Sequence, residues 1–174
     1  PQRGLSWLLD VWLYRIHKKM PDAELHIYSG AATYGTHGAG RAAQMQPILD
    51  KATSLESCNI FLHDPVPKQE LVKVLSRSRV LVYRGDPGET FCLAVGEAQA
   101  AGIPAVVKDI GCVAERIVHG RTGFVENSDA DFARATLDLL EDDTLWQQQN
   151  AAALETQRQW SWDDAALSFE RLMP

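Results

Sequence analysis

Short apolar segments alternate with helical segments along this chain, and this alternation restricts its possible folds more than any other feature. Runs rich in β-branched and aliphatic residues predict strands at 24–28, 59–62, 79–83, 105–108 and 123–125. Helical spacing of apolar residues predicts helices at about 5–16, 42–55, 68–76, 92–101 and 113–118. The strands lack clean polar alternation, which is typical of a sheet covered on both faces. The sequence therefore predicts an α/β fold, a Rossmann-like doubly wound parallel sheet with helices on both faces.

The remaining segments are predicted to be a loop and a set of C-terminal helices. The segment 30–41 is rich in glycine. A match to the GxGxxA dinucleotide fingerprint, Gly38-Ala-Gly40-Arg-Ala-Ala43, starts within it. The match starts about ten residues after its strand, and no acidic residue ends a strand about twenty residues later. We therefore interpret 30–41 as a surface loop. Ser128 and Ser161 each open a capping box, which predicts helices over about 128–172.

Composition excludes several classes of function. The 174 residues carry a formal net charge of −6 and a pI near 5.3, whereas a dedicated nucleic-acid-binding protein normally has a basic face. No apolar run approaches the roughly 18 residues of a membrane span. The three cysteines lack metal-ligand spacing. We therefore expect a single cytoplasmic domain over 1–174, without a nucleic-acid partner or a required metal.

Two glutamates lie at a predicted loop-to-helix junction. Glu89 precedes the helix, and Glu97 lies about two turns into it, because eight residues span roughly 12 Å of helix. The first N–H groups of a helix have no intrahelical partner and favour an anion, commonly phosphate. Acceptors on both sides of a phosphate suit a ligand with hydroxyl groups on both sides. The junction therefore predicts a site for a nucleotide sugar.

Several motifs together resemble those of the retaining glycosyltransferases with the GT-B fold, in particular glycosyltransferase family 4. Glu89 and Glu97 match the E-x7-E motif of that family. Further matches in the same order and spacing are 97–104 (EAMAAGxP), 109–115 (DxGGxxE), 119–124 (xGxxGF) and 161–162 (SW). Gln99 stands in place of the usual Met, and Cys112 in place of the usual second Gly. The resemblance covers about residues 2–172 and implies the C-terminal, donor-binding half of a GT-B enzyme.

The resemblance also implies roles for individual residues. Glu97 accepts hydrogen bonds from both ribose hydroxyls, and Glu89, the catalytic residue, contacts a hydroxyl of the transferred sugar. The Arg3 cation, followed by Gly4, contacts the donor pyrophosphate. The other donor-binding residues are Thr90, Phe91, Cys92 and Leu93 through backbone N–H groups, Val66 against the nucleobase, and Gly111 near the reacting centre. The implied reaction is a substitution at the anomeric carbon that needs no cofactor and no metal.

The partners implied are a nucleoside-diphosphate sugar and an N-terminal acceptor domain that is absent from this chain. Since acceptor binding belongs to that domain, we expect this chain alone to bind donor without transferring sugar. The resemblance also implies that the last helix packs on that domain. For a full-length enzyme, the resemblance implies synthesis of a polysaccharide or glycoconjugate and is compatible with peripheral contact at the inner face of the membrane. The sequence does not identify the base, the sugar or the acceptor.

Several alternatives stay open at this stage. The fold also suits a non-catalytic nucleotide-sugar-binding module or another nucleotide-using α/β enzyme, such as a sugar-nucleotide epimerase or a dehydrogenase. Cys92, at a predicted helix N-terminus, is a candidate nucleophile with a lowered pKa, and His63 is its candidate base. Arg3 is alternatively a solvated cation.

Overall fold

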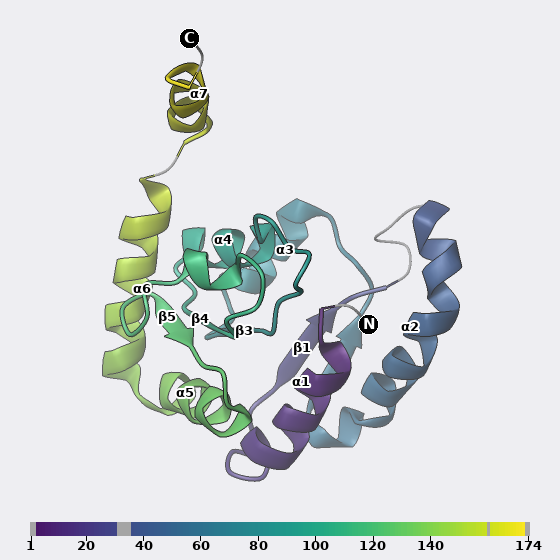
Figure 1. The fold of residues 1–174 in the computed structure, drawn as a ribbon. Helices are drawn as coiled ribbons and strands as arrows, with labels where there is room; N and C mark the ends of the chain where they lie inside the picture. Colours follow the sequence, from purple (N-terminus) through teal and green to yellow (C-terminus); the bar gives the residue numbers. More distant parts are fainter. Residues whose placement is uncertain (1–2, 31–35, 160, 173–174) are drawn as a thin grey trace.

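The computed structural model describes residues 3–30, 36–159 and 161–172. The strands of these residues are parallel: β1 (Leu25–Tyr28), β2 (Ile60–His63), β3 (Leu81–Tyr83), β4 (Ala105–Val107) and β5 (Gly123–Val125). β1 pairs with β2, and the strands β3, β4 and β5 form a second sheet in that order. The described strands therefore make two parallel sheets rather than one (Figure 1).

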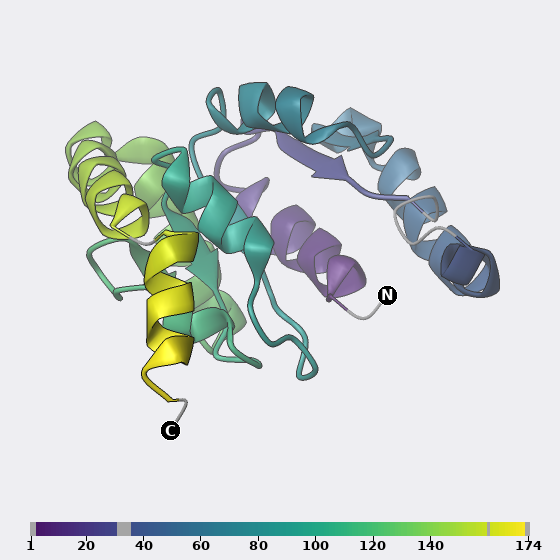
Figure 2. The same cartoon turned by 90° about the horizontal axis from the view of Figure 1, so that it is seen from above.

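Helices precede and connect these strands. The helices before β5 are α1 (Leu5–Val11), its continuation as the π-helix η1 (Trp12–Ile16), α2 (Thr36–Ser54), the 3-10 helix η3 (Glu56–Cys58), α3 (Lys68–Leu75), α4 (Leu93–Ala100) and the 3-10 helix η4 (Val113–Arg116). After β5 come α5 (Asp129–Glu141), α6 (Asp143–Arg158) and α7 (Trp162–Glu170). Figure 2 shows α1 and α3 on opposite sides of β1. The predicted α/β architecture, with a parallel arrangement and helices on both faces, is confirmed.

One predicted loop, 30–41, is wrong over its second half, 36–41. The segment 30–41 was assigned to a loop because of its glycines, but α2 begins at Thr36 and includes Gly38 and Gly40. Each glycine costs a helix interior about 1 kcal/mol relative to alanine, an amount that tertiary packing can exceed. The GxGxxA match therefore lies within a helix rather than between a strand and a helix. This position argues against a dinucleotide fingerprint and against the dehydrogenase alternative. Residues 31–35 lie outside the described part of the chain.

Two clusters of buried side chains make up the core. The larger joins α1, η1 and α5 with the strands β1, β2 and β4. Its fully buried members include Leu9, Trp12, Ile16, Ile60, Phe132 and Leu139. The smaller lies between α4, β4 and η4 and contains Cys92, Val95, Ala105, Val107 and Val113. The smaller cluster supports the loop between β3 and α4, so the predicted donor junction rests on packed side chains.

The last helix projects from the end of α6 (Figure 1). Trp162, Phe169 and Leu172 are exposed there, and none of the side chains of α7 is buried. Trp160 lies outside the described residues. Among residues 3–30, 36–159 and 161–172, no helix is long and apolar enough to cross a bilayer.

Candidate functional site

The candidate site lies where β3 ends and α4 begins. In parallel α/β sheets, ligands bind beyond the carboxyl ends of the strands. Tyr83 is the last residue of β3, and the loop 84–92 connects it to α4. Glu89 lies in this loop, with its side chain only 5% exposed. A buried carboxylate is stable only when other groups compensate its charge, so its partners define the site.

Three hydrogen bonds connect Glu89 with Arg3 and Tyr83. Arg3 Nη1 donates to Glu89 Oε1 at 2.7 Å and to the Tyr83 hydroxyl at 2.7 Å. The Tyr83 hydroxyl donates to the other carboxylate oxygen, Glu89 Oε2, at 2.8 Å. The structure thus joins two predicted site residues that lie 86 positions apart in the chain. Arg3 is therefore an ion-pair partner of Glu89 rather than only a solvated cation.

Tyr83 was not predicted as a site residue. The only signal in the sequence is its place at the end of a predicted strand, directly before the loop that carries Glu89. Burial, followed by the hydrogen bond to Glu89, raises the pKa of the Tyr83 hydroxyl well above its usual value. The hydroxyl therefore keeps its proton at every physiological pH and donates it to the carboxylate.

Cys92 is the residue before α4 and takes a left-handed backbone conformation, with φ 53° and ψ 67°. Its side chain is buried, and burial raises the pKa of the thiol to about 11; a hydrogen bond to Glu89 acts in the same direction. A nucleophilic cysteine needs a lowered pKa, so the cysteine-enzyme alternative is wrong on this point. The thiol instead is a further partner of the Glu89 carboxylate.

Glu97 lies on α4 and belongs to a different set of contacts. Lys68 Nζ lies 2.7 Å from Glu97 Oε1, and the two side chains are 72% and 29% exposed. Lys68 is the first residue of α3, directly after the loop 64–67 that contains Val66. The structure therefore brings the start of α3, beside the predicted base-binding loop, to the glutamate predicted to bind ribose. Val66 is half-buried.

A second loop packs on the first one. Gly111 has φ +63°, and a Cβ at this position would overlap the backbone carbonyl of Asp86 and lie 3.1 Å from that of Glu89. The Cys112 N–H donates to the same Glu89 carbonyl at 3.2 Å. Only glycine fits this close approach without a backbone shift. The two loops predicted to line the reacting centre are therefore in direct contact.

The exposed end of the junction carries Thr90, Phe91 and Leu93. Arg116 of η4 donates from Nε to the Phe91 carbonyl at 2.8 Å, and its guanidinium carbon lies 3.8 Å from the centre of the Phe91 ring. Arg116 was not predicted as a site residue. It fixes the backbone just before α4, where the helix presents its first N–H groups. In the described part of the chain, no three His, Cys, Asp or Glu side chains are grouped so that they could hold a metal ion.

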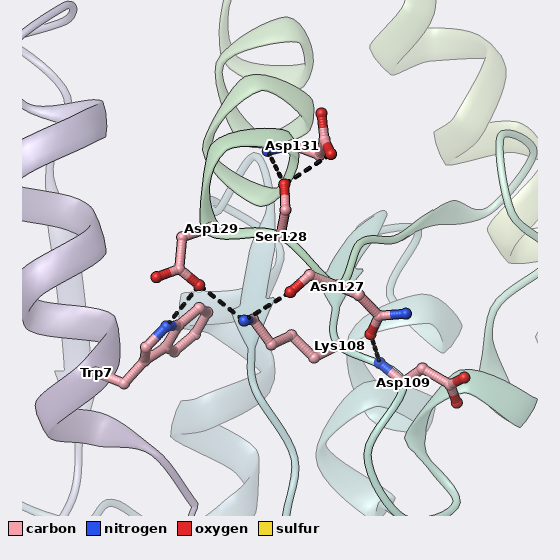
Figure 3. Close-up of polar contacts among 7 residues, drawn as sticks. All are labelled: Trp7, Lys108, Asp109, Asn127, Ser128, Asp129 and Asp131. Atoms are coloured by element: carbon pink, nitrogen blue, oxygen red, sulfur yellow. Dashed lines mark hydrogen bonds and ion pairs between the residues drawn. The ribbon is translucent and has the colours of Figure 1, made fainter.

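A buried cation lies at the neighbouring end of β4. Lys108 Nζ contacts Asp129 Oδ1 at 2.7 Å and the Asn127 carbonyl at 2.9 Å, and it lies 4.7 Å from the centre of the Trp7 ring (Figure 3). The Trp7 indole N–H donates to the same Asp129 oxygen at 2.9 Å. The hydrogen bond from Lys108 holds the pKa of Asp129 below its usual value. This cluster fastens the first turn of α1, which follows Arg3, to β4 and α5.

Comparison with known proteins gives the family. The family model described as glycosyl transferases group 1 matches residues 1–142. The D-inositol 3-phosphate glycosyltransferase of Corynebacterium diphtheriae is 33% identical over 135 residues, which are 76% of this chain and 31% of that protein. The enzyme of that name from Streptomyces avermitilis is 35% identical over 134 residues, 76% of this chain and 29% of that protein. The chain thus aligns with about a third of the length of these curated relatives.

Solved structures give the same fold. Sucrose-phosphate synthase from Thermosynechococcus elongatus has a TM-score of 0.77 at 18% identity, and the match covers 98% of this chain and 41% of that one. TarM has a TM-score of 0.76 at 22% identity, and the match covers 99% of this chain and 32% of TarM. The pneumococcal O-GlcNAc transferase GtfA, solved with UDP and GlcNAc, has a TM-score of 0.72 at 16% identity. That match covers 98% of this chain and 33% of GtfA. With the match of the family model over residues 1–142, these comparisons show that the chain belongs to the group 1 glycosyltransferases and has the fold of a C-terminal GT-B domain.

Proposed function

We propose that this chain binds a nucleoside-diphosphate sugar and provides the donor side of a retaining glycosyl transfer. The observation that carries the proposal is the buried carboxylate of Glu89, bound to Arg3 at the carboxyl end of β3 and directly before α4. Around the loop between β3 and α4, the site offers an acceptor for a sugar hydroxyl, a cation for phosphate and a helix N-terminus. A nucleotide sugar has groups that match all three.

The diphosphate would lie between the first turn of α4 and the Arg3 guanidinium. Half of the Arg3 side chain is exposed, so a ligand has access to its guanidinium. When the bond between the anomeric carbon and the diphosphate oxygen breaks, negative charge grows on the leaving diphosphate. Backbone N–H groups and a guanidinium stabilise that charge without a divalent metal.

The ribose would bind at Glu97. Its carboxylate is paired with Lys68 in the structure, and the ribose hydroxyls would share or replace that contact. Because the Lys68 side chain is 72% exposed and water screens the pair, its loss costs little, about 0–1 kcal/mol. Hydrogen bonds from hydroxyl groups to a carboxylate contribute about 1.5–3 kcal/mol, so the exchange favours the ligand.

The GtfA structure with UDP and GlcNAc supports a nucleotide-sugar ligand for this fold. In the proposed whole enzyme, an N-terminal domain provides the acceptor site and the rest of the reacting centre. We therefore expect this chain to bind the donor and not to transfer sugar by itself. The proposal does not select a base, a sugar or an acceptor.

Calorimetric titration with UDP, GDP and ADP tests the proposal, with NAD as a comparison ligand. We expect one diphosphate to bind and NAD not to bind. Glu97→Ala should weaken diphosphate binding by about 10- to 100-fold, the factor for the loss of one or two charge-assisted hydrogen bonds. The matched control is Glu70→Ala, which removes an exposed glutamate paired with Lys73 on α3. Equal affinity in Glu97→Ala and in the control, or no binding of any diphosphate, would contradict the proposed function.

A further inference from the structure

We propose that Tyr83 is a positioning residue that keeps the Glu89 carboxylate in place while Arg3 moves its hydrogen bond from Glu89 to the donor diphosphate. This inference rests on the proposed function and adds a residue to the same site. It explains how one buried carboxylate can be fully bound in the free protein and still accept a sugar hydroxyl in the complex.

The two carboxylate oxygens have different partners. Glu89 Oε1 accepts from Arg3 at 2.7 Å, and Glu89 Oε2 accepts from the Tyr83 hydroxyl at 2.8 Å. When Arg3 turns toward a diphosphate, Oε1 becomes available and Oε2 stays bound. The donor sugar then meets a carboxylate with one open oxygen and a fixed orientation.

The partners also differ in their freedom to move. The Arg3 side chain is 51% exposed, whereas that of Glu89 is 5% exposed. Tyr83 is held by the sheet, since it pairs with Val107 in the register of β3 and β4. The arginine is therefore the member of the group that can follow an incoming anion, and the tyrosine is the member that cannot.

The charge of the Glu89 carboxylate also requires that Tyr83 stay in place when Arg3 moves. A buried carboxylate that lost the Arg3 cation would be destabilised unless other hydrogen bonds remained. Tyr83 and the Cys92 thiol both stay hydrogen-bonded to Glu89 when Arg3 leaves. Because burial raises the pKa of Tyr83, its hydroxyl remains a donor throughout. The hydrogen bond from Tyr83 thus keeps the carboxylate oriented for a hydroxyl group of the sugar.

The test compares a bare diphosphate with its sugar conjugate. Within the group of Arg3, Tyr83 and Glu89, Arg3 is the member proposed to contact the diphosphate, and the sugar is the part of the ligand that needs the oriented carboxylate. Titrations of UDP against UDP-glucose, GDP against GDP-mannose and ADP against ADP-glucose identify the pair that binds. In Tyr83→Phe we expect the Kd of the diphosphate to change less than about twofold and the Kd of the sugar conjugate to rise about tenfold, the effect of one hydrogen bond.

Tyr14→Phe is the control, because Tyr14 is an exposed tyrosine of η1. It should leave both affinities unchanged. Equal weakening of both ligands in Tyr83→Phe would assign a merely structural role to the hydroxyl and overturn the inference, as would no weakening of either ligand. If the unsubstituted chain binds a diphosphate and its sugar conjugate with equal affinity, Glu89 holds no sugar hydroxyl and the inference fails while the nucleotide site stands. Absence of all binding would overturn the proposed function, and this inference with it.

Discussion

Replacing Lys108 with methionine should destabilise the fold measurably, because Lys108 links three elements from a largely buried position. Its side chain is 15% exposed and contacts Asp129, the Asn127 carbonyl and the Trp7 ring. Methionine has a similar length and keeps the apolar packing of the stem. The substitution therefore removes the charge and its contacts while it leaves little empty volume.

The expected magnitude follows from these contacts. A hydrogen bond to a charged group contributes about 1.5–3 kcal/mol when buried, but Asp129 is 39% exposed and water screens part of its attraction. The cation over the Trp7 ring adds about 0.5–1 kcal/mol. The variant no longer bears the cost of desolvating the Lys108 ammonium, and this gain offsets part of the loss. We expect a net loss of about 2 kcal/mol, or about 4–8 °C in Tm for a chain of this size.

The stability lost in Lys108→Met should be larger at neutral pH than at acidic pH. Lys108 holds the pKa of Asp129 below its usual value of 3.8, so the folded chain binds the proton less readily than the unfolded chain. The stabilisation is therefore fully present above the usual pKa and disappears as pH falls through the lowered pKa of the folded state. The difference in stability between the variant and the unsubstituted chain should narrow below about pH 4.

Thermal unfolding followed by circular dichroism, at pH 7 and again near pH 3, measures both effects. Lys73→Met is the matched control, because Lys73 forms an exposed pair with Glu70 whose side chains are 65% and 54% exposed. It should cost about 0.3–0.5 kcal/mol. The reasoning is refuted if Lys108→Met costs no more than Lys73→Met, or if its effect is the same at both pH values.

Three further substitutions have definite expected outcomes. Gly111→Ala forces a β-carbon against the Asp86 carbonyl at positive φ, so Tm should fall by the equivalent of at least about 1–2 kcal/mol and binding of a sugar nucleotide should weaken in calorimetry. Phe132→Ala empties a fully buried site in the larger core and should cost about 3–5 kcal/mol in chemical denaturation; a loss under 1 kcal/mol would contradict the packing described. Ser161→Ala removes the capping box of α7, so amide hydrogen exchange should accelerate in α7 and stay unchanged in α5.

The sequence predicted the features that depend on local patterns. Each of the five predicted strands is present within two residues of its predicted start, because short apolar runs between turn residues specify strands locally. Ser128 and Ser161 both cap helices as predicted, since a cap needs only a side chain and the next three residues. The loop predicted for 36–41 failed because glycine propensity is a weak term against the packing of a long helix.

The site was predicted less completely because its contacts are not local. The pairing of Arg3 with Glu89 joins residues at opposite ends of the first half of the chain. The family resemblance assigned both residues to the donor site but did not predict their contact. The one signal for Tyr83, its place at the end of a predicted strand, does not identify a site residue, because a tyrosine in a strand is usually a packing residue. Nor could the pattern show that Lys68 pairs with Glu97, since this contact depends on how α3 and α4 lie in space.

The separation of the strands into two sheets has a consequence for cooperativity. Among the described residues, no strand pairing joins β1 and β2 to β3, β4 and β5, so helix packing around Trp12, Ile16 and Phe132 holds these units together. Arg3 precedes the helix that leads into β1, whereas Glu89 follows β3, and their ion pair crosses the boundary. A ligand that engages both side chains therefore acts as a further link between the two sheets, and we expect it to suppress local opening on both sides of the boundary. We expect it to slow hydrogen exchange at Ile27 in β1 as much as beside the site, in proportion to its occupancy.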